Sequence, residues 1–245
     1  DIKCRMAGLK PDACVVVATV RSLKYNGGVA KNELNAENLD ALRAGIPNLL
    51  RHVSNMTEVF GLPTVVAINR FPTDTEAEIE LVREECAKLG VNVALSEVWA
   101  RGGAGGEELA REVLRLVEQP SDFAFSYEKD TPVAEAIETV AKRVYHADGV
   151  DFTAAAKKQI AQLEENGFGN LPVCMAKTQY SFTDDQHRLG APEGFRITVR
   201  EVRVAAGAGF AIALTGSAMT MPGLPKVPAA ENIDVTPEGK IVGLF

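Results

Sequence analysis

Two cations follow directly on a very apolar run near the start of the sequence. Residues Val15 to Val20 include four valines, Arg21 and Lys24 come next, and the pair Gly27–Gly28 follows. Such a run predicts a strand buried on both faces, inside a parallel sheet whose ligands bind beyond the carboxyl ends of the strands. Arg21 and Lys24 are therefore candidates for holding an anion on a polar loop, with glycines that let the backbone approach it. The alternative is that both cations only face solvent.

Two aromatic residues occupy corresponding places after the next two apolar runs. Phe71 and Pro72 follow the run Thr64 to Asn69, and Trp99, the only tryptophan, follows a shorter run that ends near Leu95. Neighbouring parallel strands end at the same edge of a sheet, so the two rings are candidates for a clamp around a planar ligand. The alternative is that both are ordinary core residues.

Motifs of nucleotide-binding loops are displaced or absent. The position three residues after Asn69 holds Pro72 instead of the carboxylate of a guanine-reading element, and Asp74 suits the start of the next helix better. The glycines at 102–106 lack the Lys-Ser/Thr of a phosphate-binding loop, and that pattern occurs nowhere in the chain. We interpret 102–106 as a flexible loop beside the ring site.

Hydrophobic periodicity predicts strands and helices in alternation, which is typical of an α/β fold. The first helical pattern, over 39–56, is interrupted at Gly45–Pro47 and predicts two helices or one kinked helix. Thr75 and Glu78 fit a capping box at the start of the next helix. Further helices are expected near 109–117, 133–145 and 153–166, with strands at 91–95, 171–176 and 195–214. A polar stretch over 180–194 predicts a boundary before a small strand-rich module.

Composition narrows the classes of function. The 245 residues carry a net charge of −7, with 33 acidic and 26 basic side chains, so we expect no nucleic-acid partner. The four cysteines are scattered, which indicates neither a zinc site nor a disulfide framework and fits a cytoplasmic protein. No apolar run approaches the length of a membrane span, so no membrane is expected. The first residue is Asp1, not methionine, and the start reads like the interior of a longer sequence.

The segment from Val17 to Gly28 closely resembles a signature of formate–tetrahydrofolate ligases and departs from it mainly at Ser22, where alanine is expected. Further resemblance lies in Asn69–Pro72, in 97–100, in 215–225 and in the last three residues, 243–245. The resemblance implies ATP-dependent joining of formate to N10 of tetrahydrofolate through formyl phosphate, with Mg²⁺ and a monovalent cation. It also implies that Phe71, Pro72 and Trp99 sandwich the pterin, with Arg21 or Lys24 near the phosphate.

Such ligases are about twice as long as this chain, and their phosphate-binding loop lies in the N-terminal half. The resemblance therefore implies a C-terminal segment that completes its site with that half and is inactive alone. We expect 1–60 to form the C-terminal part of a nucleotide-binding domain with a P-loop-type parallel sheet. Residues 61–180 are expected to form an α/β folate-binding domain, and 181–245 a small strand-rich C-terminal domain of α+β type. The family implies a cytoplasmic homotetramer. Two alternatives remain: one subunit of a split ligase, or a non-catalytic folate-binding or structural module.

Overall fold

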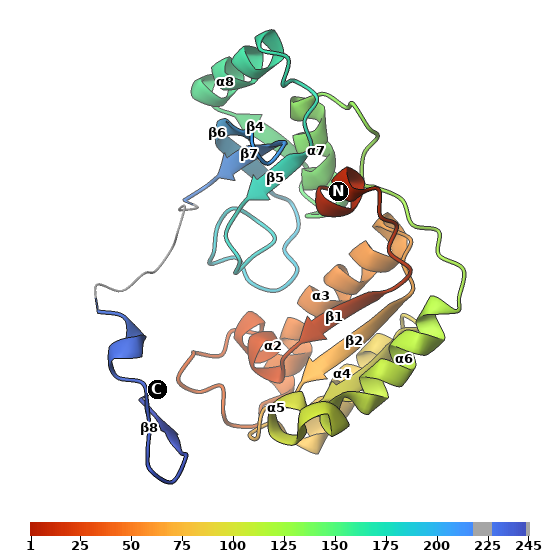
Figure 1. Ribbon diagram of the computed structural model, residues 1–245, viewed down its shortest axis with the longest axis vertical. Helices are drawn as coiled ribbons and strands as arrows, with labels where there is room; N and C mark the ends of the chain where they lie inside the picture. The colour runs from red at the N-terminus through yellow and green to blue at the C-terminus, as the bar shows by residue number, and fades with distance from the viewer. Residues whose placement is uncertain (218–226, 244–245) are drawn as a thin grey trace.

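The computed structural model describes residues 1–217 and 227–243. Most of the expected tail motif at 215–225 and the last two residues of the chain lie outside the described residues. The described chain forms two units, one around a parallel sheet and one around a mixed sheet, as Figure 1 shows. The fold is α/β, as predicted.

The parallel sheet contains β1 (Cys14–Ala18), β2 (Thr64–Asn69) and β3 (Asn92–Ser96), in the order β1-β2-β3. The helices α2 (Val20–Asn26), α3 (Leu39–Ser54) and α4 (Glu76–Ala87) cover one face, where the main core of this unit lies. On the opposite face, α6 (Glu107–Val117) packs on β2 and β3, and the short α5 (Val98–Arg101) precedes it. The predicted parallel pairing is confirmed, because each crossover passes through a helix.

The prediction that the first strand is covered on both faces is wrong for the described residues. Within them β1 is an edge strand, and Val15 and Val17 are 39% and 67% exposed, whereas Val16 packs into the core. The reason is that α6 packs mainly on β2 and β3, which leaves much of the same face of β1 exposed. Val15 and Val17 therefore form an exposed apolar strip along β1, which we call the bare strip.

The polar loop predicted after the first strand is instead a helix. The Thr19 side chain accepts a hydrogen bond from the Ser22 backbone N–H at 3.1 Å and so caps α2. Arg21 and Lys24 consequently lie one turn apart on α2. The two residues were predicted to lie on a loop, and the structure places them on a helix instead. On a helix, side chains three positions apart lie on the same face.

The interruption predicted at Gly45–Pro47 does not break the helix. α3 runs through Pro47 to Ser54 and continues as a short π-helical stretch, Asn55–Val59. A Cβ at Gly45 would lie 1.8 Å from the Leu23 carbonyl oxygen, so the glycine allows α3 to contact the α2 backbone. Close packing of α2 and α3 therefore accounts for the glycine at position 45, and the helix is not broken there.

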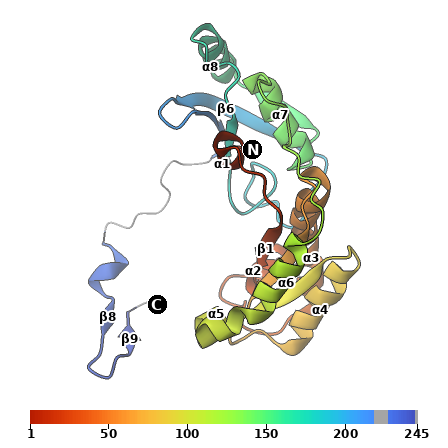
Figure 2. The same ribbon diagram turned by 45° about the vertical axis from the view of Figure 1, so that its right-hand side comes forward.

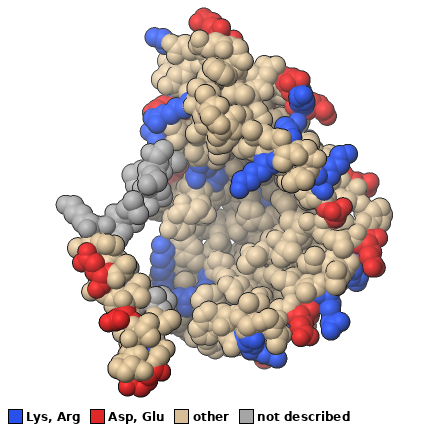
Figure 3. Space-filling view, viewed as in Figure 1, with Lys and Arg blue, Asp and Glu red and all other residues tan. Residues whose placement is uncertain are grey.

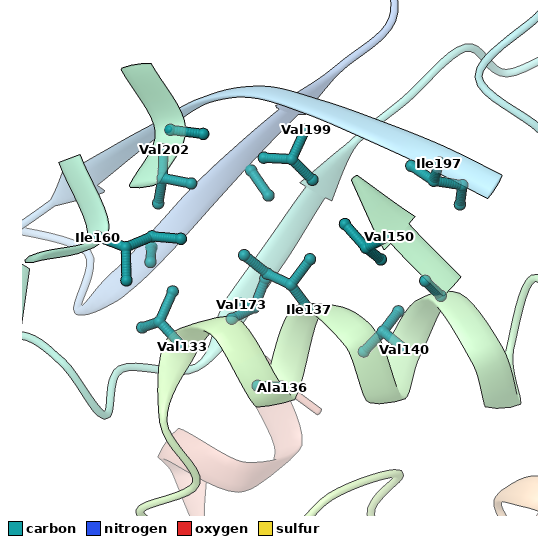
Figure 4. Close-up of a cluster of buried hydrophobic side chains, with 14 of the residues drawn as sticks. Val133, Ala136, Ile137, Val140, Val150, Ile160, Val173, Ile197, Val199 and Val202 are labelled. Carbon is teal, nitrogen blue, oxygen red and sulfur yellow. The ribbon is translucent and has the colours of Figure 1, made fainter. Parts of the chain in front are cut away.

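The mixed sheet has the strand order β4-β6-β7-β5, with β6 and β7 antiparallel and the outer pairs parallel. Its strands are β4 (Gly149–Phe152), β5 (Val173–Ala176), β6 (Arg196–Ala205) and β7 (Phe210–Thr215). The helices α7 (Val133–Arg143) and α8 (Ala154–Glu165) pack on this sheet, and Figure 4 shows Val133 and Ile137 of α7 facing Val173 of β5. The second hydrophobic core lies there.

Polar contacts join the two units. Asn48 of α3 donates to the Gly190 carbonyl oxygen at 2.8 Å, and Asn55 donates to that of Val144 at 2.8 Å. The helix α1 (Lys3–Ala7) contacts the mixed-sheet unit, because the Arg5 guanidinium donates to the Tyr127 carbonyl oxygen. Outside the two units lie the 3₁₀ turn Ala229–Glu231 and a hairpin of β8 (Asp234–Val235) and β9 (Ile241–Val242). Figure 2 shows that hairpin away from both sheets.

The predicted domain boundaries fall inside these units. The boundary between residues 60 and 61 lies between β1 and β2 of the parallel sheet, and that between 180 and 181 lies between β5 and β6 of the mixed sheet. The boundaries stay a prediction, and the hydrogen-bonded units of the structure are the two sheets with their helices.

Candidate functional site

The two predicted rings line one cavity at the carboxyl edge of the parallel sheet. β2 and β3 pair so that Asn69 faces Ser96, which brings the segments after these strands side by side. The cavity has a volume of about 730 Å³ and is lined by Arg21, Asn35, Asn69, Arg70, Phe71, Pro72 and Trp99. We call it the ring cavity. It unites every predicted site residue except Lys24.

A tight turn holds Phe71 in place. Its backbone N–H donates to Oδ2 of Asp74 at 2.8 Å, and the Asp74 N–H donates back to the Phe71 carbonyl oxygen at 3.0 Å. Burial raises the pKa of Asp74, although the hydrogen bond from Phe71 opposes the rise. The Asp74 carboxyl therefore closes the turn under the ring, and the predicted helix start belongs to Thr75, which caps α4 in a complete capping box with Glu78.

Trp99 stands on α5 and is 78% exposed, whereas Phe71 is 38% exposed. The glycines after it form a 3₁₀ turn, Gly102–Gly106, which corrects the expected flexible loop. Gly105 is buried, and its carbonyl oxygen accepts a hydrogen bond from the Glu97 N–H at 2.9 Å. A Cβ at Gly105 would lie 2.4 Å from the Glu97 carbonyl oxygen, so this glycine allows the turn to fold back against the start of α5.

Arg21 contacts both the ring cavity and Phe71. Its guanidinium carbon lies 5.4 Å from the centre of the Phe71 ring, within the range of a cation–π contact. The same guanidinium donates to Oδ1 of Asn35, a residue that the sequence interpretation did not single out. A positive charge thus lies beside one of the two rings.

Lys24 does not reach the ring cavity. Its side chain is 1% exposed, and its ammonium donates to Oε1 of Glu78 at 2.8 Å and to the Ala36 carbonyl oxygen at 2.8 Å. Burial favours neutral Glu78, but hydrogen bonds from Lys24 and from the Thr75 and Asn38 N–H groups outweigh it and lower the pKa of this carboxyl. The geometry gives Lys24 a structural contact, and its predicted catalytic role stays a prediction without geometric support.

A second cavity, of about 580 Å³, lies between the two units and also has Arg21 in its wall. We call it the interunit cavity. The sequence interpretation did not single out its other polar residues, among them Lys31, Tyr25, Tyr180 and Lys177. The signal available in the sequence was weak: Lys31 follows the predicted Arg21 loop by a few residues, but nothing in the spacing joins it to residues near 180.

The described residues offer no group of three or more His, Cys, Asp or Glu side chains that could hold a metal ion. We therefore assign none of them to Mg²⁺. In the same part of the chain, no helix is long and apolar enough to cross a membrane.

Comparison with known proteins agrees with the resemblance in the sequence. The family described as formate–tetrahydrofolate ligase matches residues 1–245. One curated relative, a formate–tetrahydrofolate ligase of Symbiobacterium thermophilum, is 60% identical over all 245 residues of the chain. The match covers 44% of that relative, so the chain spans less than half of its length.

Proposed function

This chain belongs to the formate–tetrahydrofolate ligase family, and we propose that it is the C-terminal portion of an ATP-dependent ligase that joins formate to N10 of tetrahydrofolate. The observation that carries the proposal is the ring cavity, in which Phe71 and Trp99 project from the ends of neighbouring strands. A planar, largely apolar cavity wall of this kind suits the pterin of the folate.

In the proposed complex the pterin lies between Phe71 and Trp99, with Pro72 at its edge. Offset stacking on each face contributes about 0.5–1.5 kcal/mol beyond the burial of apolar area. Both rings are already exposed to solvent, so the pterin has access to them without unfolding of either unit.

Arg21 is the chain's candidate for stabilising negative charge during transfer of the formyl group from formyl phosphate. Its guanidinium is held beside Phe71 and faces the cavity, which places a fixed positive charge close to the proposed pterin. ATP, Mg²⁺ and a monovalent cation belong to the proposal through the family. The rest of the ligase supplies the sites for these groups, and the roles proposed for Phe71, Trp99 and Arg21 do not depend on them.

Trp99 provides a direct test, because it is the only tryptophan. Adding tetrahydrofolate to the chain is expected to quench its fluorescence by ring stacking, and the quench should weaken in Phe71→Ala. An unchanged signal in the folded protein would remove the pterin from this cavity.

The role of Arg21 requires the complete ligase, meaning this chain joined to the remaining length of a family member. Arg21→Ala there is expected to lower kcat more than it raises KM for tetrahydrofolate. A variant with wild-type kcat would exclude Arg21 from the transfer step.

The bare strip on β1 supports the proposed contact with the N-terminal half of the ligase. Parallel sheets are normally covered on both faces, yet Val17 is 67% exposed and β1 has a free edge among the described residues. The same strip suits a split ligase in which this chain is one subunit. Val17→Asp should weaken co-purification with a separately produced N-terminal half, whereas Leu114→Asp, an exposed change on α6, should not. Equal retention of both variants would exclude the strip as the contact.

The cytoplasmic location and the homotetramer remain part of the proposal through the family alone. A non-catalytic folate-binding module is the outcome to accept if the complete ligase binds tetrahydrofolate but forms no 10-formyl product.

A further inference from the structure

Two buried acidic side chains lie close to Phe71. Figure 3 shows red Asp and Glu atoms mainly around the outer rim of the molecule, where water solvates them. Among the residues that the structure describes, Asp74 and Glu78 are the buried exceptions, at 5% and 0% exposure. A buried carboxyl costs free energy unless its oxygens are bound, so the partners of each residue indicate what it holds in place.

Glu78 has partners for both of its oxygens. Its Oε1 accepts from the Lys24 ammonium at 2.8 Å and from the Asn38 N–H at 3.1 Å. Its Oε2 accepts from the Thr75 N–H at 3.1 Å. These bonds join α2, which carries Lys24, to the start of α4. Glu78 is therefore explained by the packing of the parallel-sheet unit.

Asp74 has a partner for one oxygen only. Its Oδ2 accepts from the Phe71 N–H at 2.8 Å, whereas its Oδ1 is buried and has no hydrogen-bond partner in the part of the chain that the structure describes. Burial and the nearby charge of Glu78 both raise the pKa of Asp74. The contact that the fold makes with Asp74 is thus a single acceptor oxygen, and a neutral side chain of the same shape could supply it.

The chain is anchored on both sides of the turn that contains Phe71 and Asp74. The Arg70 N–H donates to the Ser96 carbonyl oxygen at 3.1 Å, which extends the pairing of β2 with β3 up to the residue before Phe71. On the other side, Thr75 caps α4. Between these anchors the turn is closed by two hydrogen bonds, one from Phe71 to Asp74 and one back. The backbone of Phe71 is therefore tied to the Asp74 side chain.

The position of the Phe71 ring matters because a planar ligand stacks on it in a narrow range of geometries. Stacked rings lie offset, with centres about 4.5–7 Å apart. The ring is 38% exposed, so packing against the protein covers only part of it. The other ring of the cavity, that of Trp99, stands on α5. The width between the two rings consequently depends on where the turn holds Phe71.

We propose that Asp74 is a positioning residue of the ring cavity, which fixes the Phe71 ring for the ligand through the Phe71 backbone. The inference rests on the proposed function, because it takes the pterin as the ligand that stacks on Phe71. Asp74 is not among the residues that line the cavity, so its effect on the ligand passes through Phe71. What this role requires is an acceptor oxygen at the right place, and not a negative charge.

The test measures Kd for tetrahydrofolate by calorimetry, together with KM and kcat, in the complete ligase. Asp74→Ala removes the acceptor, Asp74→Asn keeps it without the charge, and Asp74→Glu keeps the charge but displaces it by one methylene. The first and third variants should raise Kd and KM by about fivefold to tenfold with kcat unchanged, because stacking is impaired while the reacting atoms are untouched. Asp74→Asn should stay within about twofold of the wild type.

Asp185→Ala is the matched control, because the Asp185 side chain also closes a turn by accepting from a backbone N–H, that of His187 at 2.9 Å, in the other unit. This variant should leave Kd, KM and kcat as in the wild type. An equal rise of Kd in Asp185→Ala and Asp74→Ala would overturn the inference, since loss of any such turn would then weaken binding.

A double-mutant cycle separates positioning of the ring from a general loss of structure. In the Phe71→Ala background, Asp74→Ala should raise Kd no further, because the ring that it positions is already gone. An additive rise would overturn the inference. Where Asp74→Ala does not fold, the other two variants decide: wild-type binding by Asp74→Glu with weak binding by Asp74→Asn would overturn it in favour of the charge.

Two further outcomes distinguish this inference from the proposed function. Weaker binding in Phe71→Ala with wild-type binding in a folded Asp74→Ala would overturn the role of Asp74 and leave the pterin in the ring cavity. Unchanged Kd in Phe71→Ala would remove the pterin from the ring cavity and overturn both proposals.

Discussion

Lys24 is buried and Lys177 is partly buried; the two lysines lie in different units of the protein, and their partners differ. Lys24, in the parallel-sheet unit, pairs with the Glu78 carboxylate at 2.8 Å. Lys177, in the mixed-sheet unit, is bound by three backbone carbonyl oxygens, and burial lowers its pKa to about 8 despite the nearby Asp184. A carboxylate compensates the full charge of a buried ammonium, whereas carbonyl dipoles compensate part of it. The charge of Lys24 is therefore compensated by a carboxylate within its unit, whereas the charge of Lys177 is held at a cost in desolvation free energy.

Replacing Lys24 should have the largest effect on stability. Lys24→Met leaves the fully buried Glu78 without its cation, and we expect the free energy of unfolding to fall by about 3–5 kcal/mol in chemical denaturation. The exposed pair of Lys88 with Glu85 is the control, because Lys88→Met should change stability by no more than about 0.5 kcal/mol. Equal effects of the two substitutions would show that the buried pair contributes no more to the free energy of unfolding than the exposed pair does.

A ring residue should show the opposite pattern to Lys24. Phe71→Ala is expected to weaken tetrahydrofolate binding by roughly tenfold through lost stacking and burial, while stability changes little because the ring is 38% exposed. Fluorescence titration and denaturation of the same preparation measure both quantities. A large loss of stability in Phe71→Ala, or unchanged binding, would contradict the assignment of the ring to the ligand.

Lys177 should give a pH dependence that Lys24 does not. Its pKa of about 8 in the folded chain lies below the usual value of 10.5, so between these pH values the unfolded chain binds more protons and stability rises with pH. After screening, we expect the gain to be about 1 kcal/mol. The measurement is the difference in unfolding free energy between the wild type and Lys177→Met from pH 8 to 10. A difference that stays constant would contradict the lowered pKa.

Removing the cap that orients Glu78 should have an effect similar in size to that expected for Lys177. Thr75→Ala removes the hydrogen bond from the Glu78 N–H at 3.2 Å and should cost about 1 kcal/mol. Because Glu78 also binds Lys24, a double-mutant cycle of Thr75→Ala with Lys24→Met should show coupling. The matched cap in the other unit, Thr153 of α8, should show none. Additive effects in both cycles would mean that the cap and the ion pair act independently.

Local patterns in the sequence predicted most elements. The capping box joins Thr75 and Glu78, which are three positions apart, and is present as predicted. The alternation of apolar runs and helical periods likewise led to the parallel sheet. The helix after β1 was not predicted, because the apolar run Val15 to Val20 continues past Thr19. The cap that Thr19 forms on α2 is the local signal that indicates a helix.

The site was predictable where it follows from strand order and was not where it follows from tertiary packing. Phe71 and Trp99 come after neighbouring strands, so their presence in one cavity could be predicted. Lys24 and Glu78 are 54 residues apart, and no spacing rule joins them. The same holds for Lys31 and Tyr180, which meet only because the two units pack together.

The exposure of the two rings has a thermodynamic consequence. Trp99 and Phe71 present apolar surface to water in the free chain, and a ligand ring that enters between them removes that surface from solvent. Burial of apolar surface on binding gives a negative heat-capacity change. The enthalpy of tetrahydrofolate binding is therefore expected to become steadily more favourable as the temperature rises, with a slope that reports how much of the two rings the ligand covers.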